Sequence, residues 1–240
     1  MKIKTVKQII DESNNIKDDY IKTGFKSFDD TTGGLAKSSI SVFASRPAMG
    51  KSSLAFKIAS NVLKDNKNVL YISLENTEEN IAKKILSQNK NTPNNIPYNL
   101  NLICPMHDTN FNNIYELVSL IPSLDLIIID YYQLIDETNF NEELVISKLK
   151  ELANKLNTHI MILSTLPRNI ETRINKRPVL TDLIKHHKLV EESNLICFLY
   201  KNNNIVELNI RKNKQTNKRC KINLLFDHDT HDIKELDNVH

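Results

Sequence analysis

A short stretch of the sequence, residues 45–53, has the residue types of a loop that binds phosphate groups. It follows an apolar segment at 39–44 and overlaps the start of a helix-like pattern at 51–64. In such a loop, successive backbone N–H groups and the N-terminus of the following helix surround the β-phosphate of a nucleotide. The predicted nucleotide-binding residues are Ser45, Arg46, Pro47, Ala48, Met49, Gly50, Lys51, Ser52 and Ser53.

Two residues of this loop have specific chemical roles. Lys51 is predicted to neutralise phosphate charge during catalysis, and Ser52 to bind Mg²⁺ through its hydroxyl. Ser45 stands where the general pattern G-x-x-x-x-G-K-[ST] has its first glycine. A strand-turn-helix corner that binds no phosphate is the alternative interpretation. Since a strand precedes the loop and a helix follows it, a nucleotide with Mg²⁺ is the predicted ligand.

Two acidic residues at strand ends can complete a site for nucleotide hydrolysis. Asp130 ends the apolar run Leu126–Asp130 and is predicted to be the second Mg²⁺ ligand. Glu75 follows the run Val69–Leu74, which we expect beside strand 39–44 in a doubly wound sheet, and is the predicted general base for the attacking water. Asp130 as a turn or cap residue, and Glu75 as a charge at a helix N-terminus, are the alternatives.

Apolar segments and helix-like patterns follow one another over most of the chain. Strands without polar alternation are typical of a sheet that helices cover on both faces. The sequence therefore predicts an α/β fold with a doubly wound, mostly parallel sheet, and its tail predicts an antiparallel β-hairpin of Ile205–Ile210 and Lys221–Phe226. The other predicted strands are 39–44, 69–73, 100–104, 126–130, 160–164 and 195–200, and the predicted helices are 51–64, 77–88, 111–121 and 141–156.

The first residues of the chain have a separate pattern. Val6, Ile9 and Ile10 fall on one face of a helix, and polar residues follow them. We therefore expect a linker-type amphipathic helix and tether at 1–20 and a single domain at 21–235.

The composition fits a soluble domain and says little about partners. Lys and Arg supply 32 residues and Asp and Glu 29, so the net charge of +3 does not by itself argue for a polyanionic ligand. Cys104, Cys197 and Cys220 lack the spacing of metal ligands, as expected of reduced thiols. No segment has the apolar length of a signal peptide or of a membrane span. We expect a cytoplasmic protein that does not enter a membrane.

Together these motifs resemble the C-terminal motor domain of DnaB-family replicative helicases, which has the RecA-like P-loop NTPase fold. The resemblance covers about residues 20 to 228, and in that family the first P-loop glycine is also commonly missing. It rests on Ala44–Ser52, where Arg-Pro precedes Met-Gly-Lys, and on Ser73-Leu74-Glu75, Ile129–Ile135, Ser164–Arg168, Lys176-Arg177-Pro178 and Asp182-Leu183.

The resemblance implies an ATP hydrolase that uses Mg²⁺. It further implies a hexameric ring with ATP between subunits, translocation on single-stranded DNA, DNA unwinding in replication, and other replication proteins as partners.

The resemblance also places the contacts with DNA. Thr165 stands where the family usually has Gln, at a position thought to sense nucleotide and communicate with DNA. Ile184-Lys185-His186-His187 replaces the family's Arg-Glu followed by Ser-Gly. The residues predicted to contact DNA are Thr165, Arg168, Lys185, His186 and Lys188.

Two lysines near the tip of the predicted hairpin correspond to groups that act on the γ-phosphate of the neighbouring subunit. Lys212 matches the family's lysine, whereas Lys214 replaces its arginine finger. Both are predicted catalytic. Because an ammonium group lacks the planar fork of a guanidinium, we expect this replacement to weaken stabilisation of the transition state.

Three functional hypotheses are open from the sequence. The first is an ATP-driven helicase motor. The second is a catalytically weakened, helicase-derived nucleotide-binding regulator that interacts with a helicase or replication protein, which Thr165, Ile184 and Lys214 favour. The third is a RecA/RadA-type recombinase, which shares the core fold but fits the Arg-Pro-x-Met-Gly-Lys sequence less well.

Overall fold

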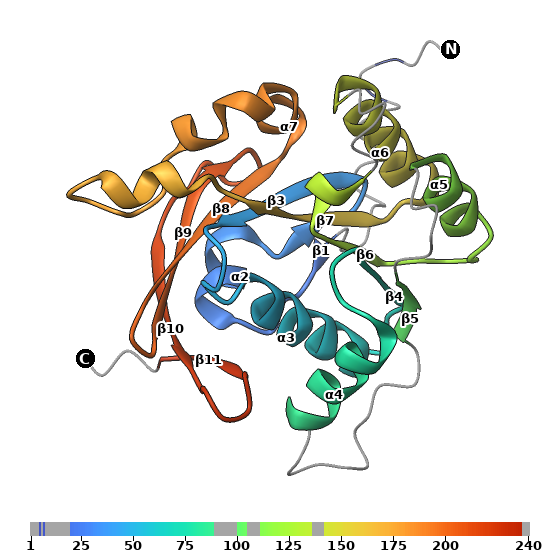
Figure 1. Ribbon diagram of the computed structural model, residues 1–240. Coiled ribbons are helices and arrows are strands. Elements are labelled where there is room, and N and C mark those ends of the chain that lie inside the picture. Colours follow the sequence, from blue (N-terminus) through green and yellow to red (C-terminus); the bar gives the residue numbers. More distant parts are fainter. Residues whose placement is uncertain are drawn as a thin grey trace.

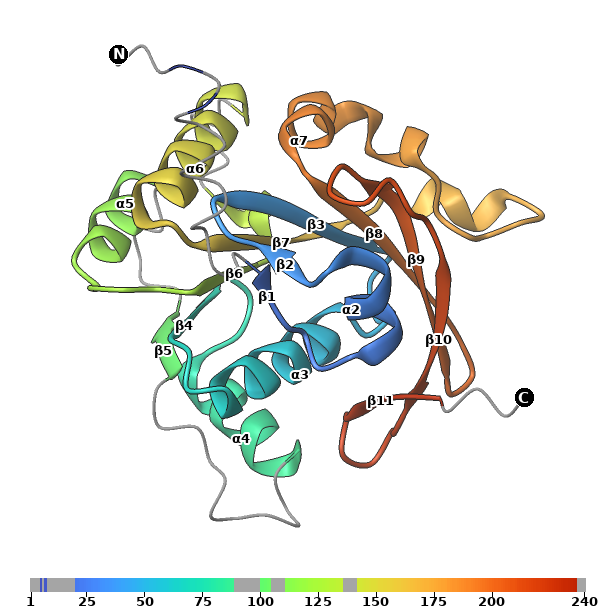
Figure 2. The same ribbon diagram turned by 180° about the vertical axis from the view of Figure 1, so that it is seen from behind.

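The computed structural model describes Thr5, Lys7 and residues 20–88, 100–104, 111–135 and 142–236. Figures 1 and 2 show the fold from opposite sides. The first elements are β1 (Tyr20–Ile21), α2 (Lys26–Thr32), β2 (Leu35–Ala36), β3 (Ser39–Ser45), α3 (Lys51–Lys64), β4 (Val69–Ser73), α4 (Glu78–Gln88), β5 (Leu100–Ile103), α5 (Phe111–Ser119) and β6 (Leu126–Asp130). They are followed by the 3-10 helix η2 (Tyr132–Leu134), α6 (Glu142–Leu156), β7 (His159–Thr165), the 3-10 helices η3 (Arg168–Thr172) and η4 (Leu180–His186), α7 (His187–Glu192), β8 (Leu195–Asn202), β9 (Ile205–Asn213), β10 (Lys221–Phe226) and β11 (Ile233–Glu235).

Nine strands within the described ranges form one sheet in the order β11-β10-β9-β8-β3-β7-β6-β4-β5. The strands from β8 to β5 in this order are parallel. Strands β8, β9, β10 and β11 pair antiparallel. The predicted doubly wound, mostly parallel α/β fold with an antiparallel C-terminal hairpin is therefore confirmed.

Helices cover both faces of the sheet. Figure 1 draws α2, α3 and α4 below it and α5, α6 and α7 above it. Tyr71 of β4 points into the same buried cluster as Leu54 of α3, whereas its neighbour Ile72 points into the cluster that contains Leu149 of α6. Because both sides of β4 are buried, its sequence shows no polar alternation. Among the helices of the described segments, none has the length and apolar character to cross a bilayer.

One predicted neighbour relation is wrong. β4, which precedes Glu75, does not lie beside β3, because β7 and β6 are inserted between them. The predicted strand 205–210 is also too short, since β9 continues to Asn213 by pairing with Leu195 of β8. Apart from Thr5 and Lys7, the predicted N-terminal helix lies outside the described residues, so it stays a prediction.

His159, the first residue of β7, makes the stability of the fold depend on pH. Its ring is fully buried, with Nδ1 2.7 Å from the carbonyl oxygen of Ala36 and Nε2 2.7 Å from the hydroxyl of Ser41. Burial lowers the pKa of His159 from 6.5 to about 4. Between pH 6.5 and 4 the ring therefore takes up a proton in the unfolded chain but not in the folded one. Since one pKa unit corresponds to about 1.4 kcal/mol, the free energy of unfolding falls by roughly 3 kcal/mol as the pH falls from 6.5 to 4.

We expect the free energy of unfolding in urea to fall between pH 6.5 and 4, and to fall less in His159→Gln, which has no titrating ring. Equal slopes for wild type and variant over this range would contradict the assignment.

Candidate functional site

A pocket of about 360 Å³ opens at the carboxyl ends of the parallel strands. In open α/β sheets, ligands bind at this edge. The pocket wall is built by the loop after β3, the start of α3, the segments after β4 and β6, and the tail that follows β10. Its lining residues are Pro47, Ala48, Gly50, Lys51, Ser52, Ser53, Glu75, Asp130, Tyr131, Thr165, Lys201, Phe226, His228 and His231.

The loop between β3 and α3 bends sharply into the pocket. Ala48 and Gly50 have left-handed backbone conformations, with φ of 62° and 90°. A glycine adopts this conformation without steric cost, which explains its place directly before the helix. α3 begins at Lys51, and its first turn lines the pocket. The free N–H groups of a helix N-terminus attract anions, so this wall suits a phosphate group.

Three of the nine predicted loop residues do not line the pocket. The Ser45 hydroxyl donates to the carbonyl oxygen of Arg46 at 2.8 Å. The guanidinium of Arg46 forms an ion pair with Glu171 at 2.6 Å, and the Met49 sulfur accepts a hydrogen bond from the backbone N–H of Lys201 at 3.3 Å. The side chains of Arg46 and Met49 therefore connect the loop to η3 and β8.

Asp130 is held in one orientation at the end of β6. Its carboxylate is 1% exposed and accepts a hydrogen bond from the Tyr71 hydroxyl at 2.6 Å. Burial, and then the charge of Asp130, raise the pKa of Tyr71 well above 10, so the phenol stays protonated and donates. The pKa of Lys51 is lowered, because burial outweighs the opposing effect of the nearby carboxylates of Asp130 and Glu75. Tyr71 was missed by the sequence analysis, and its only signal was a phenol within an aliphatic strand.

Glu75 reaches the pocket although β4 is not adjacent to β3. The backbone N–H of Leu74 donates to the carbonyl oxygen of Asp130 at 2.7 Å, which fixes the end of β4 against the end of β6. The Ser73 hydroxyl accepts from the backbone N–H of Asn76 at 3.1 Å and tightens the turn. Glu75 is exposed and lines the pocket together with Lys51 and Asp130.

A model of the DnaB-like helicase C terminal domain family matches this chain at residues 20–116 and 106–235. This chain belongs to that family. The replicative DNA helicase DnaB of Geobacillus stearothermophilus is 30% identical over 236 residues, which cover 81% of this chain and 52% of the relative. A probable replicative DNA helicase of Trieres chinensis is 30% identical over 75% of this chain and 47% of its own length. The chain thus spans about half the length of these curated relatives.

Solved structures show the same fold. A DnaB-like replicative helicase superposes with a TM-score of 0.83 at 23% identity, over 98% of this chain and 69% of that chain. A separate ATPase domain superposes with a TM-score of 0.82 at 24% identity and covers 97% of both chains. The RadB recombinase superposes with a TM-score of 0.68 at 15% identity and covers 90% of this chain.

The RecA-like fold is therefore confirmed, and the family match separates this DnaB-like chain from the recombinase hypothesis. Membership of the DnaB-like helicase C terminal domain family implies that this chain binds a nucleotide.

Thr165 lies in the pocket of this DnaB-like domain. It ends β7 and was predicted to contact DNA. The side-chain amide of Gln133 fixes its backbone: it donates to the Thr165 carbonyl oxygen at 3.1 Å and accepts from the Thr165 N–H at 3.3 Å. The same amide donates to the Ser164 hydroxyl at 2.7 Å. The position of Thr165 favours a contact with nucleotide over a direct contact with DNA.

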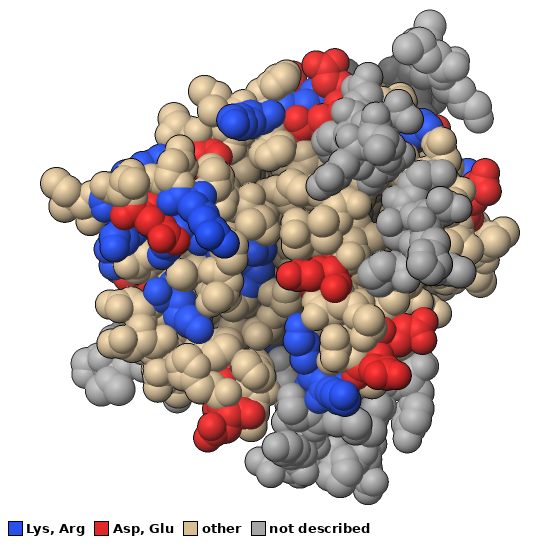
Figure 3. Space-filling view, viewed as in Figure 1, with Lys and Arg blue, Asp and Glu red and all other residues tan. Residues whose placement is uncertain are grey.

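The other residues predicted to contact DNA have different surroundings. Arg168 and Lys185 are exposed, at the start of η3 and within η4. His186 is half-buried against Glu142, and the Lys188 ammonium forms ion pairs at 3.0 Å and 3.5 Å with carboxylates of its own helix. Figure 3, viewed as in Figure 1, shows Lys and Arg side chains gathered on the left of the molecule. This is the side where Figure 1 draws η3, η4 and β8. Arg168 and Lys185 thus remain the more accessible cations.

The two lysines of the predicted trans site do not line the pocket of their own subunit. Lys212 donates to the carbonyl oxygens of Val190 at 2.5 Å and Glu191 at 3.2 Å, and Lys214 donates to Glu191 at 2.9 Å. These carbonyls lie at the C-terminal end of α7, which favours cations. Burial, and then the neighbouring Lys214, lower the pKa of Lys212 to about 8.

The far wall of the pocket was missed by the sequence analysis. The Lys201 ammonium lies 4.3 Å from the centre of the Phe226 ring, and His228 and His231 pack edge-on against the same ring. An ion pair of 2.8 Å between Lys57 and Asp232 ties this tail to α3. The ammonium group of Lys201 and the two imidazoles of this wall suit a nucleotide.

Proposed function

We propose that this chain is the ATP-hydrolysing motor of a DnaB-like replicative helicase. The observation that carries the proposal is the meeting of four residues in one pocket, although they come from three separate parts of the chain. Lys51 and Ser52 begin α3, Glu75 follows β4, and Asp130 ends β6. Relatives named replicative DNA helicases support the same activity.

In this proposal, ATP binds with its phosphates at the N-terminus of α3 and Mg²⁺ is held by Ser52 and Asp130. Hydroxyl and carboxylate oxygens are ligands that Mg²⁺ prefers. Lys51 offsets charge on the phosphates, and Glu75 orients the attacking water and accepts its proton. The buried donor Tyr71 keeps the carboxylate of Asp130 in place.

The cellular setting is also part of the proposal. The chain works in the cytoplasm on single-stranded DNA as a hexameric ring, with residues 21–235 as the motor and 1–20 as the linker to a neighbouring copy. The structurally similar DnaB-like helicase is described with its interactions with primase, which supports other replication proteins as partners.

A catalytically weakened regulator is the second candidate function. It is favoured by Lys214, which offers one ammonium where the family has arginine, and by Thr165, which is too short to extend beyond the pocket. Turnover distinguishes the two candidates, because a regulator binds ATP without hydrolysing it at a helicase rate.

The decisive experiment measures ATP hydrolysis with Mg²⁺, with and without single-stranded DNA, together with assembly state by light scattering. We expect a DNA-stimulated hexameric ATPase that Lys51→Ala inactivates. Lys64→Ala, a lysine substitution at the exposed far end of the same helix, is the matched control and should retain wild-type turnover. A monomer that binds ATP without turnover would refute the motor and leave the regulator.

A further inference from the structure

The 3-10 helix η2 contacts both the nucleotide pocket and the segment that contains Lys185. It begins two residues after Asp130. On one side, Gln133 makes three hydrogen bonds with Ser164 and Thr165 at the end of β7. On the other side, Tyr132 contacts η4. A displacement of η2 would therefore change both its contacts with the end of β7 and its contacts with η4.

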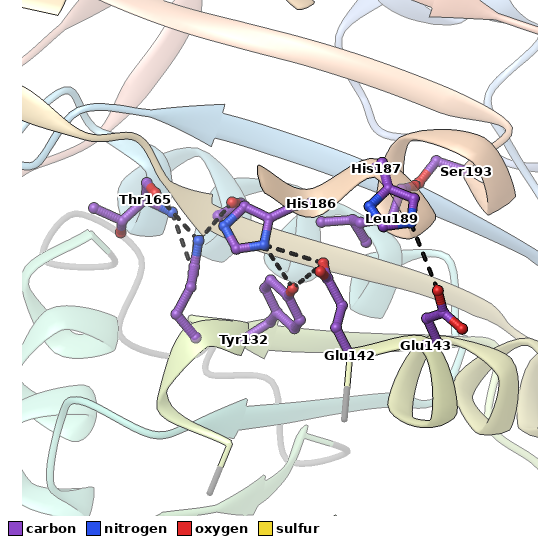
Figure 4. A network of polar contacts seen from close by, with 10 residues as sticks. Tyr132, Glu142, Glu143, Thr165, His186, His187, Leu189 and Ser193 are labelled. Carbon is purple, nitrogen blue, oxygen red and sulfur yellow. Dashed lines mark hydrogen bonds and ion pairs between the residues drawn. The ribbon is translucent and has the colours of Figure 1, made fainter. Parts of the chain in front are cut away.

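The contact between η2 and η4 is a cluster of three polar side chains. The Tyr132 hydroxyl donates to Glu142 Oε1 at 2.5 Å, and His186 Nδ1 lies 3.0 Å from the same oxygen and 3.1 Å from the Tyr132 hydroxyl. Figure 4 shows the three side chains pointing at one another from η2, α6 and η4. The rings of Tyr132 and His186 also meet edge-on, with centres 5.7 Å apart.

The protonation states within the cluster follow from its donors and acceptors. Burial, and then the hydrogen bond to Glu142, raise the pKa of Tyr132 far above its usual value, so the phenol keeps its proton. A carboxylate only accepts hydrogen bonds, so Nδ1 of His186 must be protonated to bond Glu142. Glu142 therefore accepts from both partners and holds η2, α6 and η4 together.

A second contact reinforces this junction. His187 Nε2 lies 3.6 Å from Glu143 Oε1, so consecutive residues at the start of α6 face consecutive residues at the boundary of η4 and α7. Both side chains of this pair are 69% exposed, and solvent weakens their attraction. The cluster around Tyr132, which is less exposed to solvent, is therefore the stronger connection.

We propose that Tyr132, Glu142 and His186 are positioning residues that couple nucleotide in the pocket to the conformation of residues 180–192. This segment carries Lys185, and the coupled ligand at its surface is the phosphate backbone of single-stranded DNA. The inference rests on the proposed ATP site. Nucleotide and Mg²⁺ contact Asp130 and Thr165, these residues move η2, and Tyr132 transmits the movement through Glu142 to His186.

The test measures hydrogen exchange of amides 180–192 with and without a non-hydrolysable ATP analogue and Mg²⁺, and the affinity for the analogue in the same samples. For the wild type, we expect the analogue to change exchange in this segment by about 5-fold or more, the lower end of common allosteric couplings. Tyr132→Phe removes only the hydroxyl and should abolish most of this change while the affinity stays within about 3-fold.

The His186 variants separate the polar contact from packing. His186→Leu removes the donor and should lose the coupling, whereas His186→Asn places an amide N–H near the position of Nδ1 and should retain it. Loss of the coupling in all three variants, or its persistence in Tyr132→Phe and His186→Leu, would overturn the proposal. Wild type that binds the analogue without any change at 180–192 would also overturn it. Failure to bind the analogue at all would instead refute the nucleotide site itself, and the coupling with it.

Discussion

Replacing Glu75 by Gln is expected to lower kcat for ATP hydrolysis by ~10²–10⁴-fold, the usual contribution of a general base. The amide has the size of the carboxylate but cannot accept the proton of the attacking water. Because Glu75 lies beside Lys51 and Asp130 and is exposed, the substitution should leave the fold and the binding of ATP nearly unchanged. Single-turnover hydrolysis and nucleotide titration measure the two quantities separately.

Glu79→Gln is the matched control, since Glu79 is an exposed glutamate in the first turn of α4, outside the residues that line the pocket. If Glu75 only stabilised the N-terminus of α4, its substitution would cost about 0.3–1 kcal/mol of stability and leave kcat intact. Equal kcat for wild type and Glu75→Gln would therefore refute the general base and favour this structural role.

The sequence predicted best the elements with a clear pattern: a helical period in α3, apolar runs in β4 and β6, and alternating apolar residues in β10. The bounds predicted for these four elements agree with the structure. The segment after β7 was not predicted, since η3, η4 and α7 are too short for a helical period. Tertiary packing stabilises them instead: Leu183 and Leu189 are fully buried against the sheet.

The near wall of the pocket was also predictable, because one local motif supplies Lys51 and Ser52 and a strand end supplies Asp130. The order of the strands was not, since β6 and β7 enter the sheet between two strands that precede them in sequence. The far wall depends on how the antiparallel strands β8 to β11 bring the end of the chain back to the pocket. Lys201 and His228 meet at the pocket only because β8, β9 and β10 pair side by side.

Lys214→Arg is expected to raise kcat of the assembled ring, and Lys214→Ala to lower it by ~10³-fold or more, if this residue acts as the finger on the neighbouring subunit's γ-phosphate. A guanidinium presents a planar fork to phosphate oxygens, whereas an ammonium presents a point charge. Turnover at saturating ATP under conditions that keep the ring intact is the measurement. Lys218→Ala, at an exposed lysine of the same loop, is the matched control.

The contacts of the two lysines indicate why Lys214 is the better finger. Lys212 donates to two carbonyl oxygens and is half-buried, whereas Lys214 donates to one and is exposed. If its side chain moves from α7 to a γ-phosphate, Lys214 therefore loses fewer hydrogen bonds than Lys212 does. The negatively charged phosphate is also a stronger acceptor than the neutral carbonyl oxygen that it replaces. Lys212→Ala should accordingly reduce turnover less than Lys214→Ala. The opposite order would assign the finger to Lys212, and unchanged turnover in both variants would exclude a trans role for this end of the hairpin.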